Sequence, residues 1–288
     1  MEEGRIVKLL GGVYTVEDEK GNRVNRKARG KFRHVKSSPK VGDRVLFGQD
    51  FITEILKRQN DLHRPPIANI DQAVLINSAK EPDFSFFLMD RFLVLIESED
   101  ITPIIVVNKI DLLSETELAD LQEKLSYYET FYEVYYVSKH DTERLRALSN
   151  VFADKISVLA GQTGGGKSSL LNAIDPSLSL KIGDVSKALG RGRHTTRHVE
   201  LLRICDGLVA DTPGFSKLDF GGLEAEDLPH MYPDFFELSS KCQFRGCTHM
   251  NEPKCAVKKA VANQDIPAFR YDNYKQIYQE LDAKEKRY

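Results

Sequence analysis

Short runs of alternating apolar and polar residues fill the first 64 positions of the chain. The runs GRIVKLL and GGVYTVED precede a turn at Gly21-Asn22, and VGDRVLF is separated from FITEIL by Gly48-Gln49-Asp50. Alternation on both sides of a glycine-bearing break is typical of β-hairpins. About five short strands without a convincing helix predict a small barrel of the OB-fold type.

The pattern changes at Ile70, where continuous apolar runs begin to alternate with amphipathic segments of helical length. AVLINSA, PIIVVNK, VYYVS and ISVLAG are predicted strands. Helices are expected over 86–97, 115–129 and 142–155. This alternation predicts a parallel sheet covered on both faces. Two more strands, VELLRI and GLVADTPG, follow, and beyond Gly222 only short helices and a final helix over 269–288 are expected.

These changes divide the chain into three predicted units: a β-barrel over 1–64, an α/β domain over 65–221 and a mainly α domain over 222–288. With 41% hydrophobic residues, the chain can bury a normal core. It contains no apolar run long enough to span a bilayer and no secretory signal at its start. Because it has only four cysteines, we expect a cytoplasmic protein without a disulfide scaffold or a membrane partner.

Charge is distributed unevenly, although the net charge is only −2. Residues 1–64 carry 15 Lys and Arg against 9 Asp and Glu, a net charge of +6, so the remainder carries −8. Ten of these basic residues lie between Lys20 and Arg44, with Asp43 as the single acidic residue. Such asymmetry predicts a basic contact surface for nucleic acid. A solvated charged face is the alternative.

A glycine-rich segment from Gly161 to Ser168 fits the pattern G-x-x-x-x-G-K-[ST]. It follows the apolar run ISVLA and opens the helical run SSLLNAI, which is the context that this motif requires. Its backbone N–H groups would surround the β-phosphate, and Lys167 would reach the β and γ oxygens. The Ser168 hydroxyl would bind Mg²⁺.

A second motif, Asn108-Lys109-Ile110-Asp111, directly follows the run PIIVV. Its carboxylate can accept hydrogen bonds from both the ring N–H and the exocyclic amine of guanine, a pattern that adenine does not present. Beside a P-loop, this motif selects GTP over ATP. A P-loop kinase is disfavoured because this motif and DTPG would then have no purpose.

The switch elements are predicted in RGRHTT and DTPG. Asp211 would hold Mg²⁺ through water, and the Gly214 N–H would contact the γ-phosphate. Thr195 or Thr196 would sense Mg²⁺ and the γ-phosphate, and we favour Thr196. The residue after DTPG is a phenylalanine, which cannot orient the attacking water as the usual glutamine does. His194 is the best candidate for that catalytic role unless a partner supplies the group.

The order of the motifs is unusual. Ordinary GTPases run from P-loop through switch I and DxxG to NKxD, whereas here NKID precedes the P-loop and DTPG follows it. Because domain termini are often close in space, the same sheet can be assembled from a circularly permuted chain. The α/β domain is therefore predicted to be a circularly permuted P-loop GTPase.

Three cysteines and a histidine lie within 14 residues near the C-terminus, in the pattern Cys242-x₄-Cys247-x-His249-x₅-Cys255. Three thiolates and one imidazole complete a closed tetrahedral shell, which is typical of structural zinc. One Zn²⁺ would hold together a segment whose own core is thin. Unrelated free thiols are the alternative, and Cys205 is predicted to be a core residue.

The permuted motifs, the basic barrel and the Cys/His cluster together resemble the RsgA family of bacterial small ribosomal subunit biogenesis GTPases, also called YjeQ or YloQ. GRGRHTTRHVELL and DTPGFS are especially specific to it. The resemblance covers essentially the whole chain. It implies an OB-fold, a permuted GTPase domain and a zinc domain, with GTP hydrolysis stimulated by the small subunit late in its maturation and coupled to release. It also implies catalysis by His194, competition by guanosine tetra- and pentaphosphate, and a monomer.

Two segments depart from the family pattern. The P-loop carries Thr163 and Gly165 where the family has Ser and Val, and we expect the third consecutive glycine to loosen the phosphate cradle. The element that follows the strand VYYVS and would pack behind the guanine base reads Ser-Ala-Lys-Thr-Gly in the family. Here it is Ser138-Lys139-His140 with Asp141 and Thr142. The residues predicted to bind GTP are Asn108, Lys109, Ile110, Asp111, Ser138, Lys139, Gly161, Gln162, Thr163, Gly164, Gly165, Gly166, Lys167, Ser168, Ser169, Asp211 and Gly214. A runner-up function is a constitutive RNA-binding module that nucleotide merely stabilises.

Overall fold

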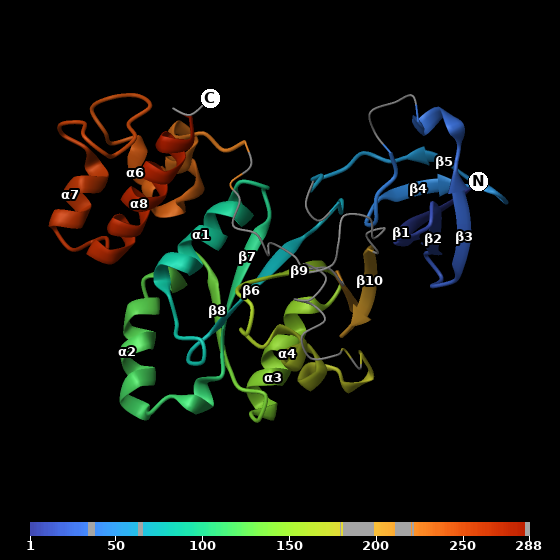
Figure 1. Cartoon of the computed structure of the whole chain (residues 1–288), viewed down its shortest axis with the longest axis horizontal. Helices are drawn as coiled ribbons and strands as arrows, with labels where there is room; N and C mark the ends of the chain where they lie inside the picture. The colour runs from blue at the N-terminus through green and yellow to red at the C-terminus, as the bar shows by residue number, and fades with distance from the viewer. Residues whose placement is uncertain are drawn as a thin grey trace.

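The computed structural model describes residues 1–33, 38–62, 66–178, 180, 199–210, 220 and 222–285. Figure 1 shows three parts: a barrel at the N-terminal end, a central sheet with flanking helices, and a helical unit that carries the C-terminus. The predicted fold class is confirmed in all three parts. None of the helices in the described ranges is both long and apolar enough to cross a membrane.

The N-terminal barrel closes through five strands. They are β1 (Glu2–Leu10), β2 (Val13–Asp18), β3 (Arg23–Ala28), β4 (Arg44–Phe47) and β5 (Phe51–Ile55). β1 pairs antiparallel with both β2 and β4, and β3 pairs parallel with β5. Alternate side chains, including Ile6, Val16, Val45 and Ile52, fill the interior and are fully buried. This closure explains why five short strands form a stable unit without a helix.

The central sheet has the strand order β10-β11-β9-β6-β7-β8. Its strands are β6 (Gln72–Ser78), β7 (Thr102–Asn108), β8 (Glu133–Val137), β9 (Ile156–Ala160), β10 (Val199–Ile204) and β11 (Gly207–Ala210). All of them run parallel except β10, which pairs antiparallel with β11. As a result β9, the strand before the glycine-rich loop, lies in the middle of the sheet.

Helices cover both faces of this sheet. They are α1 (Phe86–Glu97), α2 (Glu115–Leu125), α3 (Thr142–Ser149) and α4 (Lys167–Ile174). Val74 and Ile76 of β6 belong to the same core cluster as residues of α3 and α4, whereas Ala73 and Leu75 belong to the cluster that includes α1. α2 and α3 end earlier than the sequence predicted, because short 3₁₀ turns at Tyr128–Thr130 and Asn150–Phe152 take over from regular helix.

Barrel and central sheet are joined edge to edge, which the sequence did not indicate. β1 pairs antiparallel with β10, with Lys8 opposite Glu200 and Leu9 opposite Val199. The Lys8 Nζ lies 2.8 Å from a Glu200 carboxylate oxygen. The two regions therefore form a single sheet of 11 strands.

The C-terminal unit packs against α1. It contains the 3₁₀ segment Ala225–Met231, α6 (Pro233–Ser239), α7 (Ala256–Ala262) and α8 (Ala268–Glu285). Arg270 of α8, only 2% exposed, forms ion pairs with Asp90 of α1 and Asp234 of α6. Asp90 also accepts a hydrogen bond from the Tyr128 hydroxyl at 2.9 Å. Because a buried charge is costly without partners, this cluster fixes how the helical unit sits on α1.

Candidate nucleotide site and metal centre

The glycine-rich loop lies at the carboxyl edge of the central sheet, between the end of β9 and the start of α4. Gly161 has φ +118°, and a β-carbon there would lie 2.1 Å from the Ile76 carbonyl oxygen. Gly166 has φ +87°, and a β-carbon there would lie 2.5 Å from the side-chain nitrogen of Asn108. Both positions therefore require glycine, because the neighbouring strands leave no room for a side chain.

Gly165 differs from these two glycines. Its φ lies outside the left-handed region, and its buried N–H donates to the Gln162 carbonyl at 3.2 Å. Its own carbonyl accepts a hydrogen bond from Asn108 Nδ2 at 3.0 Å. Hydrogen bonds on both sides of this residue thus limit the freedom that a third glycine introduces.

Lys167 folds back over the loop. Its ammonium donates to the carbonyl oxygens of Gly161 and Gln162, each at 2.7 Å. Burial lowers the pKa of Lys167 to about 8, because the charged amine is taken out of water without a carboxylate partner in the described part of the chain. Oxygen atoms already surround this amine, so phosphate oxygens could replace them with little rearrangement. Ser168, the predicted Mg²⁺ ligand, is buried beside it.

Asn108 and Lys109 hold the loop from the end of β7, which is separated from β9 by β6. Besides the Asn108 bond to Gly165, the Lys109 Nζ donates to the Gly164 carbonyl at 2.9 Å and to the Glu81 carbonyl. Asp111, two residues further on, is exposed at the same edge. The structure therefore brings the two predicted motifs together and leaves the Asp111 carboxylate accessible for a base.

The loop after β6 is a neighbour that the sequence analysis missed. A β-carbon at Gly164 would lie 3.4 Å from Pro82, and the Glu81 carbonyl accepts from Lys109. Because β6 runs parallel to the P-loop strand β9, the loop that follows β6 lies at the same edge of the sheet. The order of the predicted strands could therefore have indicated this neighbour.

Ser138 and Lys139 follow β8 at the same edge. Ser138 is buried, and its hydroxyl oxygen accepts a hydrogen bond from the His140 N–H at 3.2 Å, while Lys139 is exposed. The predicted switch residues lie outside the described part of the chain. They are His194, Thr196 with its alternative Thr195, Asp211 and Gly214.

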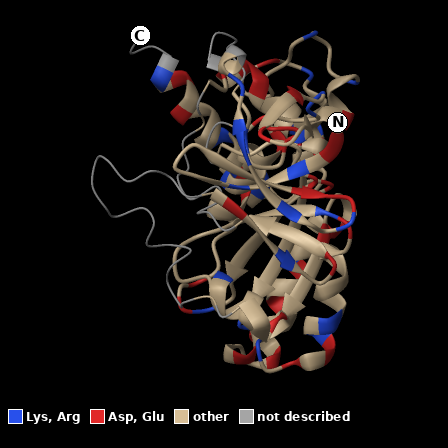
Figure 2. Ribbon diagram, turned by 90° about the vertical axis from the view of Figure 1, so that its right-hand side faces the viewer, with Lys and Arg blue, Asp and Glu red and all other residues tan. Residues whose placement is uncertain are grey.

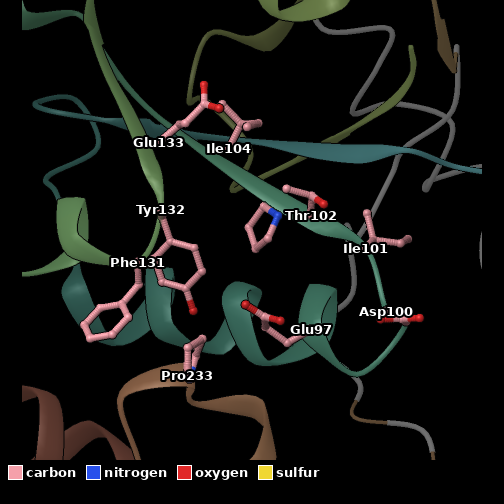
Figure 3. A pocket seen from close by; sticks show the side chains of 10 residues that line it. Glu97, Asp100, Ile101, Thr102, Ile104, Phe131, Tyr132, Glu133 and Pro233 are labelled. Carbon is pink, nitrogen blue, oxygen red and sulfur yellow. The ribbon is translucent and has the colours of Figure 1, made fainter. Parts of the chain in front are cut away.

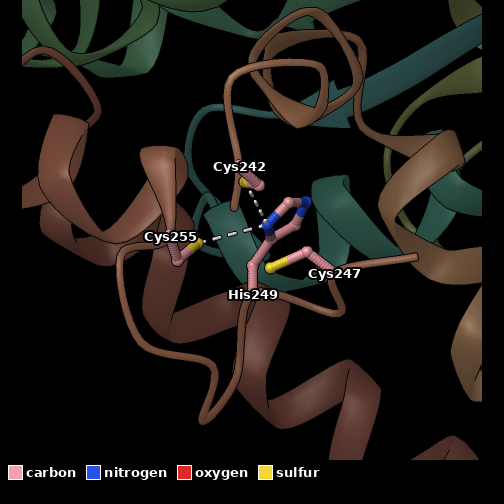
Figure 4. Close-up of side chains that lie close together, drawn as sticks. All are labelled: Cys242, Cys247, His249 and Cys255. Carbon is pink, nitrogen blue, oxygen red and sulfur yellow. Dashed lines mark hydrogen bonds between the residues drawn. The ribbon is translucent and has the colours of Figure 1, made fainter. Parts of the chain in front are cut away.

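The Cys/His cluster converges in the C-terminal unit, as Figure 4 shows. One ligand atom each from Cys242, Cys247, His249 and Cys255 lies within 4.8 Å of the others. His249 Nδ1 is 3.3 Å from Cys255 Sγ and 3.7 Å from Cys242 Sγ. Backbone N–H groups of α7 point at two of the sulfurs.

The chemistry of this cluster fits a thiophilic cation. Burial lowers the pKa of His249, so its imidazole is held neutral, as a metal ligand must be. The other ring nitrogen, Nε2, lies 3.2 Å from the Ser239 hydroxyl, which orients the ring. Burial also raises the pKa of Cys247 to about 12, so the thiol keeps its proton unless a cation displaces it.

A parallel sheet with a P-loop at its centre, a guanine motif upstream of that loop and an OB barrel at its edge defines a circularly permuted GTPase. Two family models match the chain: the RsgA N-terminal domain over residues 3–54 and the RsgA GTPase over 55–221. The chain belongs to the RsgA family of GTPases, which confirms the resemblance seen in the sequence.

Similar proteins match over their full length. Small ribosomal subunit biogenesis GTPase RsgA 2 of Oceanobacillus iheyensis is 50% identical over 294 residues and covers 100% of both chains, as does RsgA of Bacillus cereus strain ATCC 14579. The crystal structure of YloQ, a circularly permuted GTPase, superposes with a TM-score of 0.85 at 44% identity, covering 99% of this chain and 96% of that one. YjeQ from Thermotoga maritima gives 0.86 at 37% identity, covering 97% and 98%.

Proposed function

We propose that this GTPase binds the small ribosomal subunit and acts in its late maturation, with GTP hydrolysis stimulated by the subunit and coupled to release. The relatives are named for biogenesis of that subunit. The observation that carries the proposal is an exposed cationic and aromatic face on the barrel, joined through β1 and β10 to the nucleotide-binding sheet.

The structure narrows the proposed RNA-binding face of the barrel to particular residues, which the net charge of this region could not do. Figure 2 shows basic and acidic residues interspersed over this side of the molecule, so much of the positive charge is internally neutralised. Arg23 pairs with Glu17 and Arg44 pairs with Glu3. Four exposed cations of the barrel make no ion pair within the described ranges: Lys20, Lys27, Arg29 and Lys57.

One part of this face offers a surface for a nucleotide base. Lys27 of β3 lies opposite Phe51 of β5, and the Phe51 side chain is 42% exposed. Tyr14 and Phe47, by contrast, are buried in the barrel. OB-folds bind oligonucleotides on the β2–β3 face and the adjoining loops, and exposed rings stack on unpaired bases. Lys27, Arg29 and Phe51 are therefore the residues that we propose to contact RNA.

In the central domain, GTP would bind with Mg²⁺ at the carboxyl edge of the sheet. We assign phosphate contacts to the P-loop and Lys167, guanine recognition to Asp111, and Mg²⁺ coordination to Ser168 and Thr196. His194 would orient the attacking water, and guanosine tetra- and pentaphosphate would compete for the same site. The Cys/His cluster would hold one structural Zn²⁺. The chain would work as a cytoplasmic monomer in three units with boundaries after residues 64 and 221.

The experiment is GTP turnover by the purified protein alone, with small subunits and with large subunits, at low and high salt. We expect stimulation by small subunits only, and stimulation that falls with salt because phosphate contacts release counterions. A Lys27→Ala/Arg29→Ala variant should lose most of the stimulation. An Arg23→Ala/Arg44→Ala control removes the same charge from paired positions and should lose less. Equal turnover with and without small subunits would favour a constitutive RNA-binding module instead.

A further inference from the structure

A hollow of about 340 Å³ lies at the edge of the central sheet opposite the P-loop. The starts of β7 and β8 border it, together with the end of α1 and the start of α6. It therefore lies where the GTPase sheet meets the C-terminal helices, and residues from both regions would contact an occupant. Its volume is at the lower end of the range for ligand pockets.

Three carboxylates line this hollow, from Glu97, Asp100 and Glu133. Glu133 accepts a hydrogen bond from the Tyr135 hydroxyl at 2.9 Å. None of the three forms an ion pair within the described ranges, and no Lys, Arg or His is among the described lining residues. Arg270 is the nearby cation, and two buried aspartates already hold it.

A buried polar group points into the same space. The Tyr132 side chain is 7% exposed, and its hydroxyl makes no hydrogen bond of normal geometry to the described part of the chain. Figure 3 shows this hydroxyl directed toward the side of the hollow formed by Glu97. Buried polar atoms in folded proteins nearly always have a partner, and within the described residues this hydroxyl has only a hydrogen bond of poor geometry to the Glu97 carboxylate, so the pair has capacity for a further hydrogen-bond donor. Burial raises the pKa of Glu97, although the Tyr132 hydroxyl and the charge of Arg270 offset part of that rise.

We propose that this hollow binds the cationic side chain of an arginine or lysine from a basic polypeptide segment. A guanidinium or ammonium group would donate hydrogen bonds to Glu97 and to the Tyr132 oxygen, with Asp100 and Glu133 adding attraction. RNA is excluded from this site, since phosphates would be repelled by three carboxylates.

The source of the segment follows from the proposed function, on which this part of the inference rests. Proteins that neutralise RNA phosphates are rich in Lys and Arg, so a subunit particle presents basic polypeptide beside its RNA. The barrel would then engage the RNA while the hollow engages a protein of the same particle. A free polyamine has similar chemistry and is distinguished by the test.

The first test uses the full chain and a defined probe. Acetyl-Gly-Arg-Gly-amide is titrated into the protein, followed by the same peptide with neutral citrulline in place of arginine, and by spermidine. We expect the arginine peptide to bind about tenfold or more tightly than the citrulline peptide. Equal binding of the two peptides would overturn the proposal. Binding of spermidine without binding of the arginine peptide would overturn the assignment to a polypeptide.

Matched variants locate the binding. Glu97→Gln/Asp100→Asn removes two carboxylate charges from the hollow, and Glu123→Gln/Asp120→Asn removes the same two charges from the exposed face of α2. We expect the first variant to lose about tenfold in peptide affinity and the control to lose nothing. Tyr132→Phe removes only the hydroxyl and should weaken binding by about threefold. This second variant still tests the hollow if the double variant fails to fold. Equal affinities for all variants would overturn the proposal.

Subunit-stimulated GTP turnover separates this inference from the proposed function. If small subunits stimulate the wild type, the hollow variant should need about threefold more subunit for half-maximal stimulation, with unchanged turnover in the absence of subunits. Identical subunit dependence of both double variants would overturn docking of a subunit protein in the hollow. If the wild type itself shows no stimulation, the proposed function fails, while the peptide titrations still decide whether the hollow binds a cation.

Discussion

The P-loop and the Cys/His cluster are both built from short motifs, but different forces hold them in shape. The P-loop is fixed by backbone geometry and by hydrogen bonds from Asn108 and Lys109 at the end of β7. The Cys/His cluster brings its four side chains together in a small helical unit, whose described residues include no strand. A change in the first site should therefore alter ligand binding, whereas a change in the second should alter the fold around it.

Removing a metal ligand should have the largest effect. Cys247→Ser should release zinc and loosen α6 to α8, since structural zinc contributes about 10–16 kcal/mol to folding in zinc-finger peptides. Metal content and hydrogen exchange of the C-terminal helices measure this. Cys205→Ser is the matched control, because that cysteine lies outside the cluster. A full complement of zinc in Cys247→Ser would remove this residue from the ligand set.

The second largest effect is expected for Lys167→Ala, which should weaken GTP binding without changing the stability of the fold. Without the ammonium that would reach the β and γ phosphates, GTP affinity should fall by about a hundredfold or more. The melting temperature of this variant without nucleotide should stay close to that of the wild type, because the cost of burying the Lys167 charge offsets its two hydrogen bonds to backbone carbonyls. Lys124→Ala on α2 is the control. Unchanged GTP affinity in titration calorimetry would disprove the phosphate assignment.

The low pKa of Lys167 predicts a pH dependence of GTP affinity. The free protein holds this amine with a pKa of about 8, and phosphate would raise that value by favouring the charged form. Affinity should therefore be highest below pH 8 and fall by up to about tenfold per unit above it. Dissociation constants from pH 7 to 9.5 measure the effect. Lys167→Arg keeps its charge over this range, so a parallel decline in that variant would assign the titration to another group.

The smallest effect is expected at Gly165. A β-carbon there would lie 3.1 Å from the Ile76 oxygen and 3.2 Å from the Gln162 oxygen, contacts that a shift of a few tenths of an ångström relieves. Gly165→Ala should therefore change GTP affinity by less than about threefold. Gly166→Ala, at positive φ and against Asn108, should lose far more. Equal losses in both variants would contradict this distinction between the two glycines.

Much of the fold could be predicted because it depends on local patterns. Strand alternation gave the barrel, buried strands between helices gave the parallel sheet, and the motif order gave the permutation. The pairing of β1 with β10 joins segments about 190 residues apart, and no local pattern specifies it. The Asp90–Arg270–Asp234 cluster was missed for the same reason, since each of these residues alone resembles an exposed helical charge.

Within the candidate site, the sequence indicated which residues gather at the sheet edge but not what their side chains contact. Asn108 and Lys109 are predicted to bind the nucleotide, and the structure adds hydrogen bonds from both side chains to the backbone of the loop, which the motif alone did not indicate. Helix ends were also overestimated, because amphipathic patterns continue through the 3₁₀ turns that follow α2 and α3. Such details depend on tertiary contacts rather than on composition or spacing.

The strand pair β1–β10 has a mechanical consequence. A barrel tethered by a flexible linker would swivel without disturbing the GTPase, but here a load on the barrel is borne as shear along two adjoining strands. Lys8–Glu200 and Arg203–Glu17 ion pairs resist that shear. β10 begins at Val199, three positions after Thr196 in the chain. A load on the barrel therefore reaches β10, the strand that follows the predicted switch threonine in the sequence.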